Sequence, residues 1–192
     1  MDEEFETSGA DWGGLSVPLT ADPVTQAMMR LGVVDVGSNS VRMVVFDGAA
    51  RSPAYFYNEK IMCGLGEGLS DTGRLNPRGR KRALAALLRF AALGEGMGLP
   101  SLTAVATAAV REAEDGPEFC EEVRALTGIT IHVIPGEEEA RLSAQGVLLG
   151  WPGSYGMVCD IGGSSMELAD LSRGSVGLRV SSPLGPFKLK EI

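Results

Sequence analysis

One pattern governs two stretches of this chain, VVDVGSNSVRMVVFD at residues 33–47 and VCDIGGSSMELADL at residues 158–171. In each stretch an apolar run ends in an Asp, a Gly and small polar residues follow, and a second apolar run begins. Asp35 aligns with Asp160 at a spacing of 125 residues, and at the same spacing Gly37 aligns with Gly162 and Ser40 with Ser165. A chain of 192 residues that repeats one short device in this way predicts an internal duplication.

The composition sets the class of protein. A hydrophobic content of 44% with 22% charged residues is typical of a soluble globular protein, and no long uncharged apolar run predicts a membrane helix. The start, MDEEFETSGADWGG, lacks the basic residues and apolar stretch of a signal peptide, so a cytoplasmic protein is expected. A net charge of −8 argues against a nucleic-acid-binding surface.

The cysteines and the single histidine exclude several kinds of site. Cys63, Cys120 and Cys159 form no CxxC pair and are expected to be reduced thiols. With His132 as the lone histidine, a histidine zinc site or a Ser-His-Asp triad is hard to build.

The order of predicted elements is βββαβαβα followed by βββ, which is an α/β fold. The chain is expected to divide into three segments: a flexible acidic tail at 1–29, a first domain at 30–150, and the start of an incomplete second domain at 151–192. Strands are expected at 31–36, 41–47, 54–62, 102–106, 129–134, 157–161, 165–171 and 175–180. Helices are expected at 77–93, 108–115, 117–126 and 137–149.

The repeated device suits phosphate chemistry. Glycine lets the backbone approach a ligand closely, and successive N–H groups in such a turn can bind an anion. The hydroxyls of Ser38, Ser40, Ser164 and Ser165 add donors, and an Asp at the strand end can hold Mg²⁺. A single copy reads more simply as an ordinary β-hairpin, but two copies at matching positions favour a phosphate clamp.

Two further segments carry charged groups toward the same end of the predicted sheet. Glu137, Glu138 and Glu139 occupy the first turn of a helix, where carboxylates favour the helix dipole. Because three adjacent residues spread around the helix, one of them will face the same side as the helix start and could activate a water. Arg111 follows a strand at its carboxyl end, where ligands of α/β sheets bind, and could contact a phosphate.

These segments together resemble the exopolyphosphatase/guanosine pentaphosphate phosphatase (Ppx/GppA) family of the actin-like ATPase superfamily. The matching stretches occur in the family's order, from about Val33 to the C-terminus: VDVGSNSVRMVVFD, GLGEGLSDTGRLNP, ATAAVREAED, GITIHVIPGEEEARLSAQGV, DIGGSSMEL and SPLGPFKL. The resemblance implies a ribonuclease H-like (actin-like) βββαβαβα domain, followed by the first strands of its duplicate, with the active site between the halves.

The resemblance also implies roles for single residues. Asp35 and the turn Ser38, Asn39 and Ser40 match the first phosphate loop; Asp160, Gly162, Gly163 and Ser164 match the second. Glu139 matches the catalytic base, Arg111 a phosphate contact, and Glu167 an acidic residue that assists the metal or the water. Mg²⁺ is the implied cofactor, with Asp35, Asp160 and Glu167 around it.

The implied reaction is hydrolysis of a terminal phosphoanhydride bond in inorganic polyphosphate or guanosine pentaphosphate. The alternatives are a kinase of the same superfamily and a non-catalytic module that binds a nucleotide or a partner chain. Two departures from the family are visible: Ser164 stands where a third glycine is usual, and the second half is short. An exposed apolar sheet face and weak activity are therefore expected, and a second copy of the chain is a candidate partner.

Overall fold

The first half of the protein is built around a five-stranded mixed sheet. The computed structural model describes residues 30–47 and 55–189, so the predicted tail and the predicted strand start at Ala54 lie outside the described residues. The sheet has the order β3-β2-β1-β4-β5. Its strands are β1 (Leu31–Val36), β2 (Ser40–Phe46), β3 (Tyr55–Met62), β4 (Leu102–Ala106) and β5 (Ile131–Val133). The first three form an antiparallel meander, and β4 and β5 run parallel to β1.

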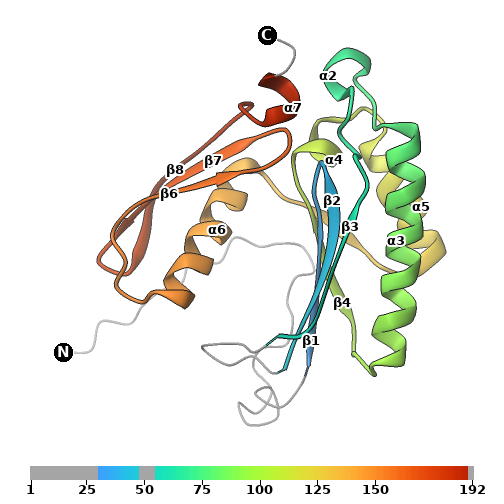
Figure 1. Ribbon diagram of the computed structural model, residues 1–192, viewed down its shortest axis with the longest axis horizontal. Coiled ribbons are helices and arrows are strands. Elements are labelled where there is room, and N and C mark those ends of the chain that lie inside the picture. Colours follow the sequence, from blue (N-terminus) through green and yellow to red (C-terminus); the bar gives the residue numbers. More distant parts are fainter. Residues whose placement is uncertain (1–29, 48–54, 190–192) are drawn as a thin grey trace.

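Two long helices cover one face of this sheet (Figure 1). They are α3 (Pro77–Gly96) and α5 (Gly116–Thr127), and both pack away from the second half of the molecule. The side chain of Asn76 accepts hydrogen bonds from the N–H groups of Arg78 and Gly79, which caps the start of α3. Gly128, in the left-handed region at φ 73°, ends α5. The core between helices and sheet is apolar and includes Val34, Met43, Leu87, Phe90 and Phe119, all at 0% exposure.

The second half is a three-stranded antiparallel sheet with one helix on it. The strands β6 (Gly156–Ile161), β7 (Met166–Ser172) and β8 (Ser175–Ser182) lie in that order. Helix α6 (Gly136–Gly150) covers the face nearer the first sheet, where Ala140 and Ala144 pack against Ala169 and Leu171. Small side chains on both elements allow this close approach. Helix α6 thus belongs by its packing to the second sheet, although it precedes residue 151.

The opposite face of the second sheet is apolar and exposed. Cross-strand register places Cys159 beside Leu168, and Leu168 beside Val180, so these side chains form a continuous surface. The large exposed residues on these strands are Met157, Ile161, Leu178 and Val180. The expected exposed apolar face is therefore present, and its self-association stays a prediction.

The observed order of elements confirms the predicted fold class, with three differences in detail. Two short helices, α2 (Leu69–Thr72) and α7 (Pro186–Leu189), were not predicted. The expected helix 108–115 ends early as α4 (Ala108–Glu112), because Ala113 turns to an extended backbone. A Cβ at Gly116 would lie 2.0 Å from the carbonyl oxygen of Val110, so the chain can fold back there only with glycine.

No helix among the described residues combines the length and the apolar character needed to cross a bilayer.

Candidate active site

The two repeated turns have the same local geometry. In the first turn, between β1 and β2, the N–H of Gly37 donates to the carbonyl oxygen of Ser40 over 3.0 Å. In the second turn, between β6 and β7, the N–H of Gly162 donates to the carbonyl oxygen of Ser165 over 2.9 Å. The spacing of 125 residues in the sequence therefore corresponds to two equivalent hairpin turns.

These two turns meet at the junction of the two halves. A Cβ built on Gly163 would lie 3.0 Å from Cβ of Ser38, so the second turn lies directly against the first. Ser38 and Ser164 are buried at 4% and 1% exposure, whereas Asn39 is exposed and Ser40 is half-buried. The structure thus brings together all six residues expected to bind phosphate, and the burial of Ser38 and Ser164 leaves Asn39 and Ser40 as the more accessible side chains.

Each turn is backed by the segment that follows the third strand of its own half. After β3, the N–H of Gly66 donates to the carbonyl oxygen of Ser38 over 2.8 Å. After β8, a Cβ on Gly185 would lie 2.5 Å or less from backbone atoms of Ser164, and the N–H of Phe187 donates to the carbonyl oxygen of Gly163 over 2.9 Å. Leu65–Gly66 and Leu184–Gly185 are therefore corresponding Leu-Gly pairs in the two halves.

Asp35 and Asp160 lie close enough to influence each other across the junction. Partial burial raises the pKa of the Asp35 carboxyl, and the negative charge of Asp160 raises it further, while Arg42 and Lys60 act in the opposite direction. Although the Asp35 side chain is accessible to solvent, protein surrounds enough of it to disfavour the charged form. The hydroxyl of Ser143, on α6, donates to Oδ2 of Asp160 and orients that carboxylate.

Glu139 is the carboxylate of the first turn of α6 that faces this junction. Burial raises its pKa to about 7, with further contributions from the charges of Glu167 and Asp160. Arg111 opposes this shift, since its Nη1 donates to Oε2 of Glu139 over 3.2 Å. The neighbours differ: Glu137 is exposed, and Glu138 forms an ion pair with Arg141. Of the three glutamates, Glu139 is the one that contacts Arg111 and is influenced by the charges of Glu167 and Asp160.

Glu167 is buried behind the second turn. It is 1% exposed, and its Oε1 accepts a hydrogen bond from the hydroxyl of Ser181 over 2.8 Å. Its other oxygen, Oε2, is buried and has no hydrogen-bond partner among the described residues. A buried carboxylate oxygen without a partner is costly, so Oε2 of Glu167 is a candidate contact for a ligand.

The donor set suits a divalent cation only with help from a substrate. No group of three or more His, Cys, Asp or Glu side chains within residues 30–47 and 55–189 is arranged to hold a metal ion. Mg²⁺, however, is commonly bound by one or two carboxylates together with substrate phosphates and water. Asp35 and Asp160 fit that requirement. The negative charge of Asp160 raises the pKa of Asp35, and a bound cation would offset this repulsion.

A cavity of about 460 Å³ opens beside Arg111, between the start of α6 and the end of β8. Its lining includes Arg111, Gly136, Glu137, Ser165, Ser181 and Ser182. Arg111 therefore faces both Glu139 and open space, which places its guanidinium where an anionic ligand could reach it.

Several residues of this site were not predicted. Ser143 lies four residues after Glu139 on α6, so helical spacing placed it on the same face and could have identified it. Gly66 lies in the matching stretch GLGEGLSDTGRLNP, but no role was predicted for it. A Cβ there would lie 3.0 Å from Ser38 and 3.1 Å from Ser164, and no local pattern in the sequence reveals this contact between distant segments.

The family model described as the Ppx/GppA phosphatase family matches residues 44–192. The chain belongs to this family. It is 34% identical over 164 residues to Exopolyphosphatase 1 of Mycobacterium tuberculosis, an alignment that covers 84% of this chain and 48% of that protein. Exopolyphosphatase 1 of Mycobacterium leprae is 33% identical to this chain over 164 residues, with the same coverage of the two proteins.

Solved structures of the family have the same fold. An exopolyphosphatase from Cytophaga hutchinsonii superposes with a TM-score of 0.79 at 27% identity, covering 85% of this chain and 53% of that one. A Ppx/GppA family member from Aquifex aeolicus gives a TM-score of 0.74 at 29% identity, covering 85% and 54%. This family member therefore spans about half the length of the relatives that it matches.

Proposed function

We propose that this protein is a phosphohydrolase that releases the terminal phosphate of inorganic polyphosphate. The observation that carries the proposal is the meeting of the two phosphate turns near Glu139, whose contact is Arg111 and whose pKa is raised to about 7. A general base works best when its pKa lies near the working pH, and Glu139 meets this condition. Membership of the Ppx/GppA family and similarity to exopolyphosphatases support the substrate class.

In the proposed reaction, Glu139 orients a water molecule and accepts its proton at a carboxylate oxygen. The water oxygen forms a bond to the terminal phosphorus, the bond to the bridging oxygen breaks, and the shortened polyphosphate leaves. Arg111 and the backbone N–H groups of the two turns stabilise charge on the phosphoryl oxygens.

Mg²⁺ is part of the proposal. Asp35 and Asp160 would hold it, and when bound it would neutralise the non-bridging oxygens of the substrate. Glu167 lies deeper and is bonded to Ser181 on β8, so we assign it to raising the pKa of Glu139. Guanosine pentaphosphate carries the same terminal phosphoanhydride and is the second proposed substrate.

The test is phosphate release from polyphosphate by the purified protein with Mg²⁺, with guanosine pentaphosphate as a second substrate in parallel. Calorimetric titration with polyphosphate adds a measurement that does not depend on turnover. We expect Mg²⁺-dependent binding that Arg111→Ala weakens, together with phosphate release that Glu139→Gln abolishes. A protein that neither binds nor cleaves either substrate would contradict the proposal.

A further inference from the structure

The first phosphate turn is held from behind by the segment Cys63–Asn76, which we call the brace loop. The N–H groups of Cys63 and Gly64 both donate to the carbonyl oxygen of Asn39, over 2.8 and 2.9 Å. The N–H of Gly66 donates to the carbonyl oxygen of Ser38 over 2.8 Å. In a trans peptide the C=O and the following N–H point in opposite directions. Fixing these two carbonyls therefore turns the N–H groups of Asn39 and Ser40 away from the brace loop.

The brace loop also touches the rest of the site. A Cβ on Gly66 would lie 3.0 Å from Cβ of Ser38, 3.1 Å from Oγ of Ser164 and 3.3 Å from Cβ of Ala109. These three atoms belong to the first turn, the second turn and α4, and α4 carries Arg111. A shift of the brace loop by a few tenths of an ångström would therefore be felt by all three segments.

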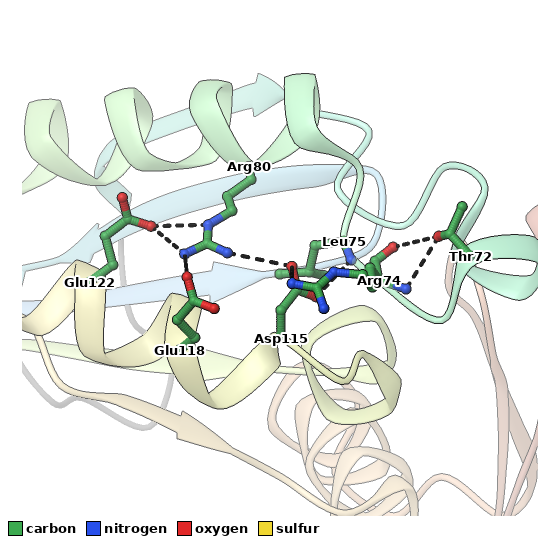
Figure 2. Close-up of polar contacts among 7 residues, drawn as sticks. All are labelled: Thr72, Arg74, Leu75, Arg80, Asp115, Glu118 and Glu122. Atoms are coloured by element: carbon green, nitrogen blue, oxygen red, sulfur yellow. Dashed lines mark hydrogen bonds and ion pairs between the residues drawn. The ribbon is translucent and has the colours of Figure 1, made fainter.

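The far end of the brace loop is fixed by one buried carboxylate, Asp115. The N–H of Leu75 donates to Oδ1 of Asp115 over 2.9 Å, and both residues are buried. The other oxygen, Oδ2, receives the guanidinium groups of Arg80 at 3.4 Å and of Arg74 at 3.7 Å. Figure 2 shows Asp115 between these two arginines and the backbone of Leu75.

Arg80 connects this carboxylate to α5. Its guanidinium forms ion pairs with Glu118 at 2.8 Å and with Glu122 at 2.7 Å, both on α5 (Figure 2). Among the described residues, the hydrogen bonds and ion pairs of both glutamates go to Arg80, so they share Arg80 with Asp115 without sharing its bond to Leu75.

Asp115 lies in the same short connection that ends the Arg111 helix. The N–H of its neighbour Glu114 donates to the carbonyl oxygen of Gly73 over 2.9 Å, which joins this connection to the brace loop a second time. The turn 113–116 therefore links Arg111 on one side with the support of Ser38 and Asn39 on the other.

From these contacts we propose that Asp115 is a positioning residue for phosphoryl transfer. It acts through the brace loop on the first phosphate turn and, through the end of α4, on Arg111. Asp115 does not touch the substrate, and the proposal rests on the proposed function for its consequence in catalysis. Nothing in the sequence around REAEDGPEF distinguishes this Asp from the surrounding acidic residues.

The test compares Asp115→Ala and Asp115→Asn with the control Glu118→Gln, which alters the same ion-pair network at an exposed position. Amide hydrogen exchange is measured by mass spectrometry over residues 63–76 and 38–40. We expect faster exchange confined to these two segments in Asp115→Ala. Asp115→Asn should restore most of the protection, since its amide oxygen can still accept from Leu75, and the control should match the parent.

Kinetics supply the second measurement. Because small misplacement of catalytic groups costs up to about 100-fold in rate, we expect kcat to fall about 10–100-fold in Asp115→Ala with a smaller change in KM, and to recover in large part in Asp115→Asn. A purely structural role would instead lower the melting temperature and leave kcat per folded molecule unchanged.

The two measurements separate the proposals. If the parent releases no phosphate, the proposed function fails, while exchange at 63–76 and 38–40 still tests the positioning role. Equal exchange in these segments for Asp115→Ala and Glu118→Gln would overturn it. Should Asp115→Ala not fold, Asp115→Ser takes its place, because its shorter side chain lacks the carboxylate that accepts from Leu75. Exchange and kcat equal to those of the control would then overturn the proposal equally.

Discussion

Nη1 of Arg111 donates hydrogen bonds to Oε2 of Glu139 over 3.2 Å and to the carbonyl oxygen of Ile134 over 2.8 Å. One nitrogen thus joins α4 of the first half to the start of α6. The backbone bond fixes where the guanidinium lies, and the carboxylate bond moderates the raised pKa of Glu139. Arg111 can therefore serve both the base and an anionic ligand from one position.

The first prediction concerns the base itself. Replacing Glu139 by Gln removes the proton acceptor without changing its shape, so we expect phosphate release to fall by about 10²–10⁴-fold. Glu137→Gln is the matched control, because Glu137 lies in the same helical turn but is exposed. Near-parental turnover in Glu139→Gln would show that Glu139 is not the base and only complements the helix dipole.

The pH dependence of the rate follows from the same residue. A general base acts only when deprotonated, and the pKa of Glu139 is about 7. The rate should therefore rise through pH 6–7 and level off above about pH 8. A rate that is flat from pH 5.5 to 8 in a kcat profile would contradict this role.

Stability should change with pH in the opposite direction. The pKa of Glu139 is raised from 4.5 to about 7 on folding, so between these values the folded state binds more protons than the unfolded state. The free energy of unfolding therefore falls as pH rises through this window. Glu139→Gln removes that loss. Without Mg²⁺, we expect the free energy of unfolding of the variant, relative to that of the parent, to be about 1–3 kcal/mol higher at pH 8 than at pH 4.5. Urea unfolding at the two pH values checks this, with Glu137→Gln as control.

The metal prediction compares the two aspartates. Asp160→Ala should weaken Mg²⁺-dependent release more than Asp35→Ala, because Asp160 is oriented by Ser143 and shares the second half with Glu167. Chelation of Mg²⁺ should abolish release in the parent. Identical Mg²⁺ titration curves for Asp160→Ala and the parent would rule out a role for Asp160 in holding the cation.

Thiol labelling tests the exposed face of the second sheet. Cys159 is exposed there, whereas Cys63 is buried and burial raises the pKa of its thiol. A disulfide reagent should therefore modify Cys159 rapidly and Cys63 only on unfolding. If a second copy covers this face, labelling of Cys159 will slow as the protein concentration rises, and light scattering will show the dimer.

The sequence predicted the elements well because they depend on local patterns. The apolar runs of β1 and β2, the caps around α3 and the repeated turn all depend on neighbours within a few residues. Glu139 could be separated from Glu137 and Glu138 only by the family resemblance, since the helix pattern alone leaves all three open. Contacts between distant segments, such as those of Gly66 with Ser164 and of Asp115 with Leu75, leave no local pattern. Nor did the pattern show that α6 packs on the second sheet.

The paired Leu-Gly segments bear on the origin of the protein. In both halves the proposed phosphate turn and the segment that supports it belong to one continuous stretch, from β1 to Gly66 and from β6 to Gly185. An ancestral gene for one such stretch would already have encoded a turn together with its own supporting segment. Copying that gene would have produced a working pair without any new supporting segment, after which mutation could make the two halves unequal, as Asn39 and Ser164 now are at matching positions.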